Sequence, residues 1–478
     1  MKPEKDLQQL LESIDHRGYP NYKSTAGAWR FENYVLFIDH VQGDPFAAPS
    51  SLHVELAGNV AGIPAENIDT AEKKTAMEDY LLRCFYEQTG KFSFQAKGSG
   101  KSGVISVMRP GQEVARRSAL EIDAASGSVL ARFEVGFPAN GRTINARELI
   151  KILFQFLPQC VERALFYKNI NGKAAQAAVK LAADQAALRR QMKEQELLAF
   201  VADGAVLPRA SGVSDKPMKS AVAFRSPQSL RVTLKKSDGS DISGMGIRRG
   251  ITLLVGGGYH GKSTLLKAME RGVYSHIAGD GREYVLTDAD AVKIRAEDGR
   301  SIWHTDISMF IGHLPNGKST ECFDSEDASG STSQAANVVE AMEAGATAFL
   351  IDEDTSATNF MIRDELMQRV IARDKEPITP YIERVKELWE DYGISTVLVA
   401  GSCGSYIDVA DTIIQMDSYL PCDITDHAKE LAKDYPAVAQ APRRMERPSF
   451  ARRPRRHPQI VYKGRIKLKV QGRDSISV

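Results

Sequence analysis

A glycine-rich stretch in the second half of the chain decides the fold: Gly256-Gly257-Gly258-Tyr259-His260-Gly261-Lys262-Ser263-Thr264. It has the spacing G-x-x-x-x-G-K-[ST] of a phosphate-binding loop. The apolar run Ile251–Val255 precedes it and a helical pattern follows, which is the strand–loop–helix context that the motif requires. Backbone N–H groups of such a loop surround phosphates, and the following helix N-terminus attracts negative charge. We therefore predict that Lys262 reaches the β- and γ-phosphates of a nucleotide and that the Ser263 hydroxyl binds Mg²⁺.

A second motif, further along the chain, is an apolar run over residues 346–351 that is followed directly by Asp352 and Glu353. A buried parallel strand does not readily accommodate two carboxylates unless something cationic meets them. Downstream of a phosphate-binding loop, this pattern predicts that Asp352 helps to hold Mg²⁺ and that Glu353 polarises the attacking water. Lys262 and Glu353 are thus the predicted catalytic residues.

Between these motifs lies a hydroxyl-rich turn, residues 328–334, which opens a helical pattern. Its residues Ser329, Gly330 and Ser331 suit a second anion site, because N–H groups and hydroxyls at a helix start receive phosphate oxygens. Taken alone, the turn fits an ordinary N-cap equally well. Its place shortly before Asp352 favours the phosphate role.

The order of the three motifs resembles that of the ATP-binding cassette ATPases. The resemblance is closer still to one subfamily, the predicted ATPases of the ABC class, whose relatives are associated with RNA processing and include a kinetoplastid RNA-editing accessory ATPase. The segments that carry it are residues 40–46, 257–263, 294–300, 328–336, 352–361 and 376–380.

The resemblance implies an enzyme that binds ATP and Mg²⁺ between two cassettes arranged head to tail. Since this chain has one cassette, it implies a homodimer. Ser329 and Gly330 would then act in trans, whereas the phosphate-binding loop and the Asp352–Glu353 pair would act in cis.

The sequence also departs from that family. The usual switch histidine is absent, and residues 401–405 occupy its place. No glutamine stands near residues 306–313, where Asp306 is the candidate polar group on the Mg²⁺ side. These departures predict slow hydrolysis. Because family members commonly extend further, Val478 is expected to be a truncation point or an internal boundary.

The predicted fold class is α/β: an ABC-type P-loop domain with a mixed α/β N-terminal domain and a short basic C-terminal extension. Residues 1–147 form the N-terminal domain, and residues 148–209 a helical hairpin with a kink or break at Pro158 and a long helix over residues 173–201. A linker over residues 210–220 leads to the ATPase domain, residues 221–425. Residues 426–478 comprise a short helix, an arginine-rich strap and a basic strand.

Composition excludes several classes of protein. The longest uncharged stretch, residues 392–407, is rich in Gly and Ser, so no transmembrane helix and no membrane partner is expected. The N-terminus lacks the apolar core of a signal peptide. The five Cys are scattered, and neither they nor the nine His have the spacing of a metal site. These features predict a cytoplasmic protein with reduced thiols.

Charge is balanced overall, with 62 Lys and Arg against 61 Asp and Glu, but its distribution is not even. Residues 443–478 carry 12 basic and 2 acidic residues. Basic side chains neutralise nucleic-acid phosphates, so these positions predict RNA or DNA binding without sequence reading, although a solvated charged face is the alternative. A cassette that acts on a protein cargo is the competing function. The candidate nucleic-acid residues are Lys97, Lys101, Arg109, Arg116, Arg142, Arg452, Arg453, Arg455 and Arg456.

Overall fold

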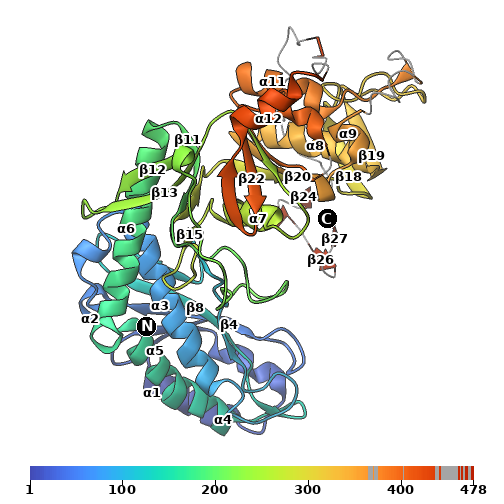
Figure 1. Cartoon of the computed structure of the whole chain (residues 1–478). Helices are drawn as coiled ribbons and strands as arrows, with labels where there is room; N and C mark the ends of the chain where they lie inside the picture. The colour runs from blue at the N-terminus through green and yellow to red at the C-terminus, as the bar shows by residue number, and fades with distance from the viewer. Residues whose placement is uncertain are drawn as a thin grey trace.

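The computed structural model describes residues 1–363, 370, 375–401, 403–435 and 441–442, and the backbone of β24 (Val461–Tyr462), β25 (Arg465–Ile466), β26 (Lys469–Gln471) and β27 (Ser475–Ser477). Four predicted nucleic-acid residues lie outside the described residues: Arg452, Arg453, Arg455 and Arg456. Figure 1 shows an N-terminal lobe and a C-terminal lobe. Within the described ranges, no helix is long and apolar enough to cross a membrane.

A seven-stranded sheet forms the N-terminal lobe, with the order β1-β2-β3-β4-β8-β5 and with β7 also paired to β8. Only β1 and β2 are parallel within it. In β8, Val129, Ala131, Phe133 and Val135 are buried and the residues between them are not, so one face of the sheet covers the core. The strands are β1 (Lys2–Pro3), β2 (Gly27–Arg30), β3 (Val35–His40), β4 (Ser50–Leu56), β5 (Ile105–Ser106), β7 (Leu120–Ile122) and β8 (Val129–Val135), with the separate pair β9 (Ala139–Asn140) and β10 (Thr143–Ile144).

Helices complete this core, in which Leu11, Phe85 and Cys160 are fully buried. A π-type stretch, Lys151–Phe156, joins two of them, and Pro158 stands in the first turn of the second. Because Pro158 has no N–H to donate, the helix widens here and does not break. The helices are α1 (Glu4–Ile14), α2 (Gly58–Ala61), α3 (Ala71–Phe92), α4 (Ala146–Ile150) and α5 (Leu157–Leu165).

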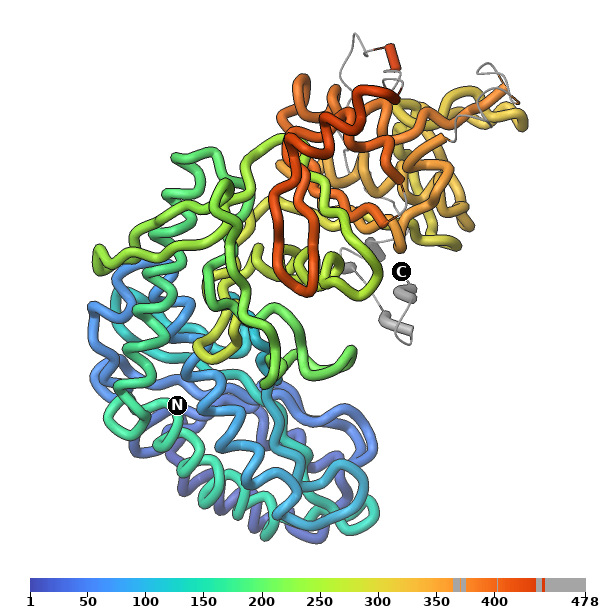
Figure 2. Tube along the Cα trace, in the orientation of Figure 1, coloured from blue at the N-terminus to red at the C-terminus, as the bar shows by residue number. Residues whose placement is uncertain are grey.

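Helix α6 (Gly172–Glu194) spans both lobes, as the green part of the trace in Figure 2 shows. Its N-cap is Asn171, whose side chain accepts a hydrogen bond from the Ala174 N–H. The prediction of a helix to residue 201 was wrong, because α6 ends at Glu194 and β11 (Leu197–Ala202) follows. All six residues of β11 are buried, so this run suits a strand enclosed between two others.

That strand belongs to an antiparallel sheet with the order β12-β13-β11-β16. Its other members are β12 (Arg231–Lys235), β13 (Asp241–Arg248) and β16 (Val285–Thr287). Residues 210–220, predicted as a linker, form turns and bends between β11 and β12.

A six-stranded sheet with the order β17-β20-β21-β14-β22-β23 forms the centre of the C-terminal lobe, and its first five strands are parallel. The strands are β14 (Ile251–Val255), β17 (Ala291–Ile294), β20 (Ala348–Asp352), β21 (Ser395–Val399), β22 (Thr412–Asp417) and β23 (Leu420–Asp423). A hairpin of β18 (Arg300–Thr305) and β19 (Phe323–Ala328) lies beside it. The α/β class predicted for this part of the chain is therefore confirmed.

Two helices cover opposite faces of this parallel sheet. Leu265 of α7 (Lys262–Arg271) packs in one apolar cluster with Leu254 of β14, whereas Val338 of α8 (Gly330–Glu343) packs in another with Leu253. Successive residues of a strand point to opposite faces, so α7 and α8 lie on different sides. The other helices are α9 (Thr358–Met361), α11 (Tyr381–Glu390) and α12 (Thr425–Ala432), the last of which confirms the predicted short helix.

A carboxylate joins the two sheets of the C-terminal lobe. The Asp288 side chain accepts hydrogen bonds from the Asp290 N–H and the Thr347 hydroxyl, both at 3.0 Å, and forms an ion pair with Arg249. Burial opposes ionisation of Asp288, but these hydrogen bonds and the arginine outweigh it and lower the pKa below its usual value. Thr347 directly precedes β20, so Asp288 fixes the start of the strand that carries Asp352.

Candidate functional site

The predicted phosphate-binding loop connects β14 to α7, as its sequence context requires. Two of its glycines have backbone conformations that L side chains rarely adopt: φ is +135° at Gly256 and +100° at Gly261, the N-cap of α7. A Cβ on Gly256 would lie 2.4 Å from the Met416 carbonyl oxygen, so a side chain is excluded there. In contrast, a Cβ on Gly258 meets nothing within 4 Å.

Lys262 turns back over this loop. Its Nζ donates hydrogen bonds to the carbonyl oxygens of Gly256, at 2.6 Å, and Gly257, at 2.9 Å. Ser263 and Thr264 follow in the first turn of α7, where N–H groups lack partners within the helix. The cation, the hydroxyl of Ser263 and the positive end of α7 thus converge at one place.

The two variable residues of the loop have different environments. Tyr259 is 98% exposed and has φ of +64°. His260 Nδ1 accepts a hydrogen bond of 3.0 Å from the Ser418 N–H, which ties the loop to the turn between β22 and β23. The same nitrogen lies 3.2 Å from an Asp417 carboxylate oxygen, so the His260 ring positions the loop against the end of β22.

A cavity of about 240 Å³ opens beside the loop. Gly261 and Thr264 form one wall, and the other walls are largely apolar. Their side chains include Leu207, Phe224, Met416 and Tyr419. An apolar cavity next to a phosphate-binding loop has the character required for a nucleotide base.

Asp352 and Glu353 lie at the carboxyl end of β20, and the phosphate-binding loop follows the carboxyl end of β14. Because β20, β21 and β14 are parallel neighbours, both groups lie at the same edge of the sheet. The Asp352 side chain is only 6% exposed and accepts a hydrogen bond from the Asp354 N–H at 3.3 Å. Hydroxyl and carboxylate oxygens, such as those of Ser263 and Asp352, are the ligands that Mg²⁺ prefers.

Glu353 is held by the segment that replaces the switch histidine. Its Oε2 accepts a hydrogen bond of 2.5 Å from the Gly401 N–H, just beyond β21. Sequence reasoning missed this contact, because a backbone donor has no side-chain identity to read. This hydrogen bond orients the Glu353 carboxylate at the edge of the sheet that Asp352 and the phosphate-binding loop share.

The hydroxyl-rich turn begins α8, with Ser329 as its N-cap residue and Gly330 as its first residue. Ser329 Oγ lies 2.9 Å from the Thr332 hydroxyl and 3.5 Å from that of Ser331. These hydroxyls and the first N–H groups of a helix of 14 residues lie together where the second anion site is predicted.

A buried glutamine connects this turn to the segment after Glu353. Gln334 is fully buried, its Nε2 donates to Ser356 Oγ at 3.1 Å, and its Oε1 accepts from the Ala357 N–H at 2.8 Å. The Ala296 N–H donates to the Thr355 carbonyl at 2.9 Å, so residues 294–300 join the same network. Three segments singled out in the sequence are therefore interlocked.

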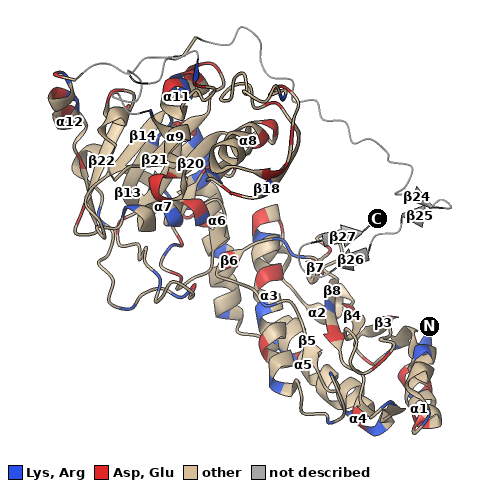
Figure 3. Ribbon diagram, turned by 90° about the vertical axis from the view of Figure 1, so that its right-hand side faces the viewer, with Lys and Arg blue, Asp and Glu red and all other residues tan. Residues whose placement is uncertain are grey.

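The structure brings Lys97, Lys101 and Arg142 to neighbouring loops of the N-terminal lobe. The Lys101 N–H donates to the Pro45 carbonyl at 2.8 Å, and Arg142 Nε donates to the Asp44 carboxylate at 2.7 Å. All three basic side chains belong to exposed residues. Along α3, in contrast, basic and acidic residues are mixed (Figure 3).

Two exposed aromatic rings accompany these cations. Phe46 and Phe94 are each 61% exposed. A Cβ on Gly100 would lie 2.9 Å from the Phe46 ring, and the Phe94 N–H donates to the Gly103 carbonyl at 2.7 Å. The Phe46 ring thus lies against residues 97–103, and the backbone of Phe94 is bonded to the same segment. We call Phe46, Phe94, Lys97, Lys101 and Arg142 the loop cluster.

The other described candidates lie on a different segment. Arg109 and Arg116 are exposed and stand between β5 and β7, on either side of β6 (Glu113–Val114). Their neighbour Arg117 forms an ion pair with buried Asp79.

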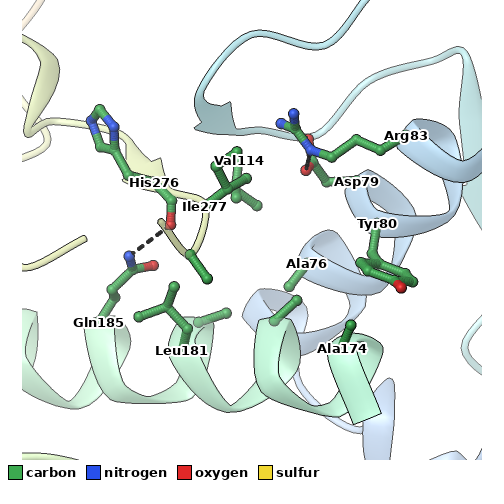
Figure 4. A pocket seen from close by; sticks show the side chains of 13 residues that line it. Ala76, Asp79, Tyr80, Arg83, Val114, Ala174, Leu181, Gln185, His276 and Ile277 are labelled. Atoms are coloured by element: carbon green, nitrogen blue, oxygen red, sulfur yellow. Dashed lines mark hydrogen bonds and ion pairs between the residues drawn. The ribbon is translucent and has the colours of Figure 1, made fainter. Parts of the chain in front are cut away.

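β6 connects the lobes by pairing with β15 (Ser275–His276), shortly after α7. Arg271 is the last residue of α7, and its Nη1 lies 3.6 Å from Glu113 Oε1. Arg189 of α6 donates to the Gly272 carbonyl at 2.7 Å. A cavity of about 250 Å³ lies at this junction between α3 and α6, where Gln185 donates to the His276 carbonyl at 3.1 Å (Figure 4).

Comparison with known proteins agrees with this geometry. Residues 171–453 match the family ABC_ATPase, described as a P-loop domain, and residues 4–168 match ABC_N, the N-terminal part of the ATPases of the ABC class. Fold and loop thus define a P-loop ATPase. The chain belongs to the ATPases of the ABC class, which confirms the resemblance, and at the level of that family it is an ATP-hydrolysing enzyme.

An uncharacterized protein of Methanocaldococcus jannaschii is 26% identical over 307 residues. The match covers 62% of this chain and 66% of the archaeal protein. Among solved structures, cbiO1 of Clostridium perfringens, part of an ABC transporter complex, is similar at 13% identity and a TM-score of 0.29, covering 48% of this chain and 87% of that protein. An ATP-binding cassette of an ABC transporter in its ADP conformation is similar at 12% identity and a TM-score of 0.27. This match covers 43% of this chain and 93% of that cassette. The family assignment rests on the two family matches.

Proposed function

We propose that this protein is a Mg²⁺-dependent ATPase that hydrolyses ATP at a homodimer interface and couples hydrolysis to the binding of nucleic acid, RNA in the first instance. The observation that carries the proposal is the meeting of Lys262, Asp352 and Glu353 at one edge of the parallel sheet. That edge is where ligands bind in open α/β sheets.

Each residue has a chemical role in this proposal. Lys262 moves from the loop carbonyls to the β- and γ-phosphates, which are the stronger hydrogen-bond acceptors. Ser263 and Asp352 hold Mg²⁺, which neutralises charge that develops on the transferred phosphoryl group. Glu353, oriented by the Gly401 N–H, accepts a proton from the attacking water.

The dimer is supported by the positions of α7 and α8. The two helices cover opposite faces of the parallel sheet, so the Ser329–Gly330 end of α8 and Lys262 of one chain belong to different sides of the domain. A second copy that supplies Ser329 and Gly330 in trans completes the phosphate site. Ser331 extends the same set of donors.

The coupling is supported by the junction between the lobes. The end of α7 is tied to the N-terminal lobe through the pairing of β6 with β15 and through Arg271 and Glu113. A displacement of α7 when the dimer closes on ATP therefore moves the N-terminal lobe.

The loop cluster supports the nucleic-acid ligand. Aromatic faces stack on unpaired bases and cations neutralise phosphates, and both kinds of side chain occur in the loop cluster. Arg109 and Arg116 extend the cationic surface, and the arginines Arg452, Arg453, Arg455 and Arg456 lie in the part of the chain that the structure leaves undescribed. We therefore propose binding that follows the phosphate backbone.

The test is ATP hydrolysis by the full chain with and without a mixed RNA pool, at low and moderate salt. We expect RNA to stimulate turnover and the stimulation to fade with salt, since phosphate contacts release counterions. The double variant Lys97→Glu/Lys101→Glu should lose the stimulation, and Lys173→Glu, at an exposed lysine of α6, should keep it. Hydrolysis indifferent to RNA at both salt concentrations would refute the coupling and favour a protein cargo.

A further inference from the structure

A second cluster of chemically active side chains lies on the hairpin of β18 and β19, away from the ATP site residues. His304 is the next-to-last residue of β18, Cys322 immediately precedes β19, and Asp324 is the second residue of β19. Residues 306–322 form the loop between the strands, so the three side chains meet at the base of that loop. β19 ends at Ala328, directly before Ser329.

Three donor atoms converge here. His304 Nδ1 lies 3.0 Å from a carboxylate oxygen of Asp324 and 3.5 Å from Cys322 Sγ, and all three ligand atoms lie within 4.8 Å of one another. For a tetrahedral zinc ion with Zn–N and Zn–O bonds of about 2.0 Å and a Zn–S bond of about 2.3 Å, the N–O and N–S separations are about 3.3 and 3.5 Å. The observed separations thus match two edges of that tetrahedron to within a few tenths of an ångström.

Hydrogen bonding alone satisfies this group poorly. One ring nitrogen, His304 Nδ1, faces both the thiol and the carboxylate. If it carries a proton, its one N–H serves Asp324 and leaves the thiol without a bond to the ring; if it is bare, it can accept from the Cys322 S–H but then faces the negative charge of Asp324. A cation between the three atoms removes the conflict, because each atom then directs a lone pair at the same charge.

The backbone orients the ligands in advance. The His304 N–H donates a hydrogen bond of 2.8 Å to Asp324 Oδ1, which leaves Oδ2 toward the ring. A carboxylate that is held by a second hydrogen bond in this way is the usual arrangement around metal ligands. His304 also has φ of +49°, which is an uncommon conformation for a residue other than glycine. With this backbone conformation the His304 ring reaches both Cys322 and Asp324.

We propose that His304, Cys322 and Asp324 bind Zn²⁺. The combination of thiolate, imidazole and carboxylate selects Zn²⁺ over Mg²⁺ and Ca²⁺, which take oxygen ligands. The His304 side chain is 71% exposed, so the ion has access and water takes the fourth position. On binding, the Cys322 thiol releases its proton to solvent and the sulfur donates an electron pair to the metal.

Zinc here would close the loop of residues 306–322 and fix the start of β19. Because β19 leads directly to Ser329, the ion would restrict the approach of the hydroxyl-rich turn to a partner. The metal site itself is independent of the proposed ATPase cycle, and its test requires no turnover.

The test is titration of the full metal-free chain with Co²⁺, a spectroscopic substitute for Zn²⁺, in the absence of nucleotide. We expect one equivalent of Co²⁺ to produce a near-ultraviolet thiolate-to-cobalt absorption band, which one equivalent of Zn²⁺ removes. The band should be lost in Cys322→Ser. In His304→Ala the apparent affinity for Co²⁺ should be at least tenfold weaker. Cys422→Ser is the matched control, since Cys422 is also an exposed, free thiol, and it should keep the band.

Thermal unfolding supplies an independent measurement. A ligand that binds only the folded state raises the melting temperature, so Zn²⁺ should raise it in the parent and in Cys422→Ser but not in Cys322→Ser. Unchanged ATP binding by Cys322→Ser establishes that this variant is folded. A cobalt band that persists in Cys322→Ser, or a parent chain that gives no band and no thermal shift, would overturn the proposal.

Discussion

Replacing Glu353 by Gln tests the assignment of the catalytic base with little structural change. Glu353 Oε2 accepts a hydrogen bond from the Gly401 N–H at 2.5 Å, and the carbonyl oxygen of Gln accepts the same bond. We therefore expect the free energy of unfolding to change by no more than about 0.5 kcal/mol. The amide cannot accept a proton from water, so the contribution of general base catalysis is lost.

That contribution is typically 10²- to 10⁴-fold, which corresponds to about 2.7–5.5 kcal/mol in the activation free energy. The sequence departures from the family predict slow hydrolysis in the parent, so the loss should lie toward the lower end of this range. We expect kcat to fall about 100-fold while ATP affinity is kept, and the ATP-bound dimer to accumulate. Phosphate release under single-turnover conditions and light scattering measure the two effects. Turnover equal to that of the parent would refute the role of Glu353.

Three further predictions concern other parts of the ATPase. Gln334→Leu leaves the partly buried Ala357 N–H without its acceptor, and urea unfolding should show a loss of about 1–3 kcal/mol. Gly256→Ala should lower both the melting temperature and ATP affinity, because its Cβ would approach a carbonyl oxygen to 2.4 Å, whereas Gly258→Ala should leave the melting temperature unchanged. Asp288 has a lowered pKa when folded, so the unfolded chain binds more protons and stability falls as pH drops below about 4. Urea midpoints between pH 7 and 3 should fall less steeply in Asp288→Asn.

Local motifs explain why so much of the C-terminal lobe was predictable. The phosphate-binding loop, the strand that ends in Asp352 and the turn that starts α8 are each continuous in sequence, and their glycine, acidic and hydroxyl residues have direct physical roles. The run Leu197–Ala202 was misassigned to a helix because no glycine or proline separates it from α6 and its apolar residues do not alternate. Only pairing with β13 and β16 makes it a strand.

The parts of the site that sequence did not reveal depend on contacts between distant residues or on backbone groups. Gly401 acts through its N–H, which every residue except proline also has. Gln334 gains its role from two partners after Glu353. His304 and Cys322 are separated by a loop, so their spacing matches no metal-binding motif, and only the pairing of β18 with β19 brings them together.

The end of α7 is where nucleotide binding and the N-terminal lobe meet. Lys262 begins this helix. The residues that follow the helix are held by Arg189 of α6, whose Nη2 donates to the Gly272 carbonyl at 2.7 Å and to the Tyr274 carbonyl at 3.2 Å. Burial lowers the pKa of Arg189 to about 10, which still leaves it charged near neutral pH. α6 cannot follow α7 without carrying α3, because these two helices pack together in the N-terminal lobe. A rotation of α7 must therefore either break the hydrogen bonds of Arg189 or move the N-terminal lobe as a unit. Movement of the whole lobe keeps these hydrogen bonds.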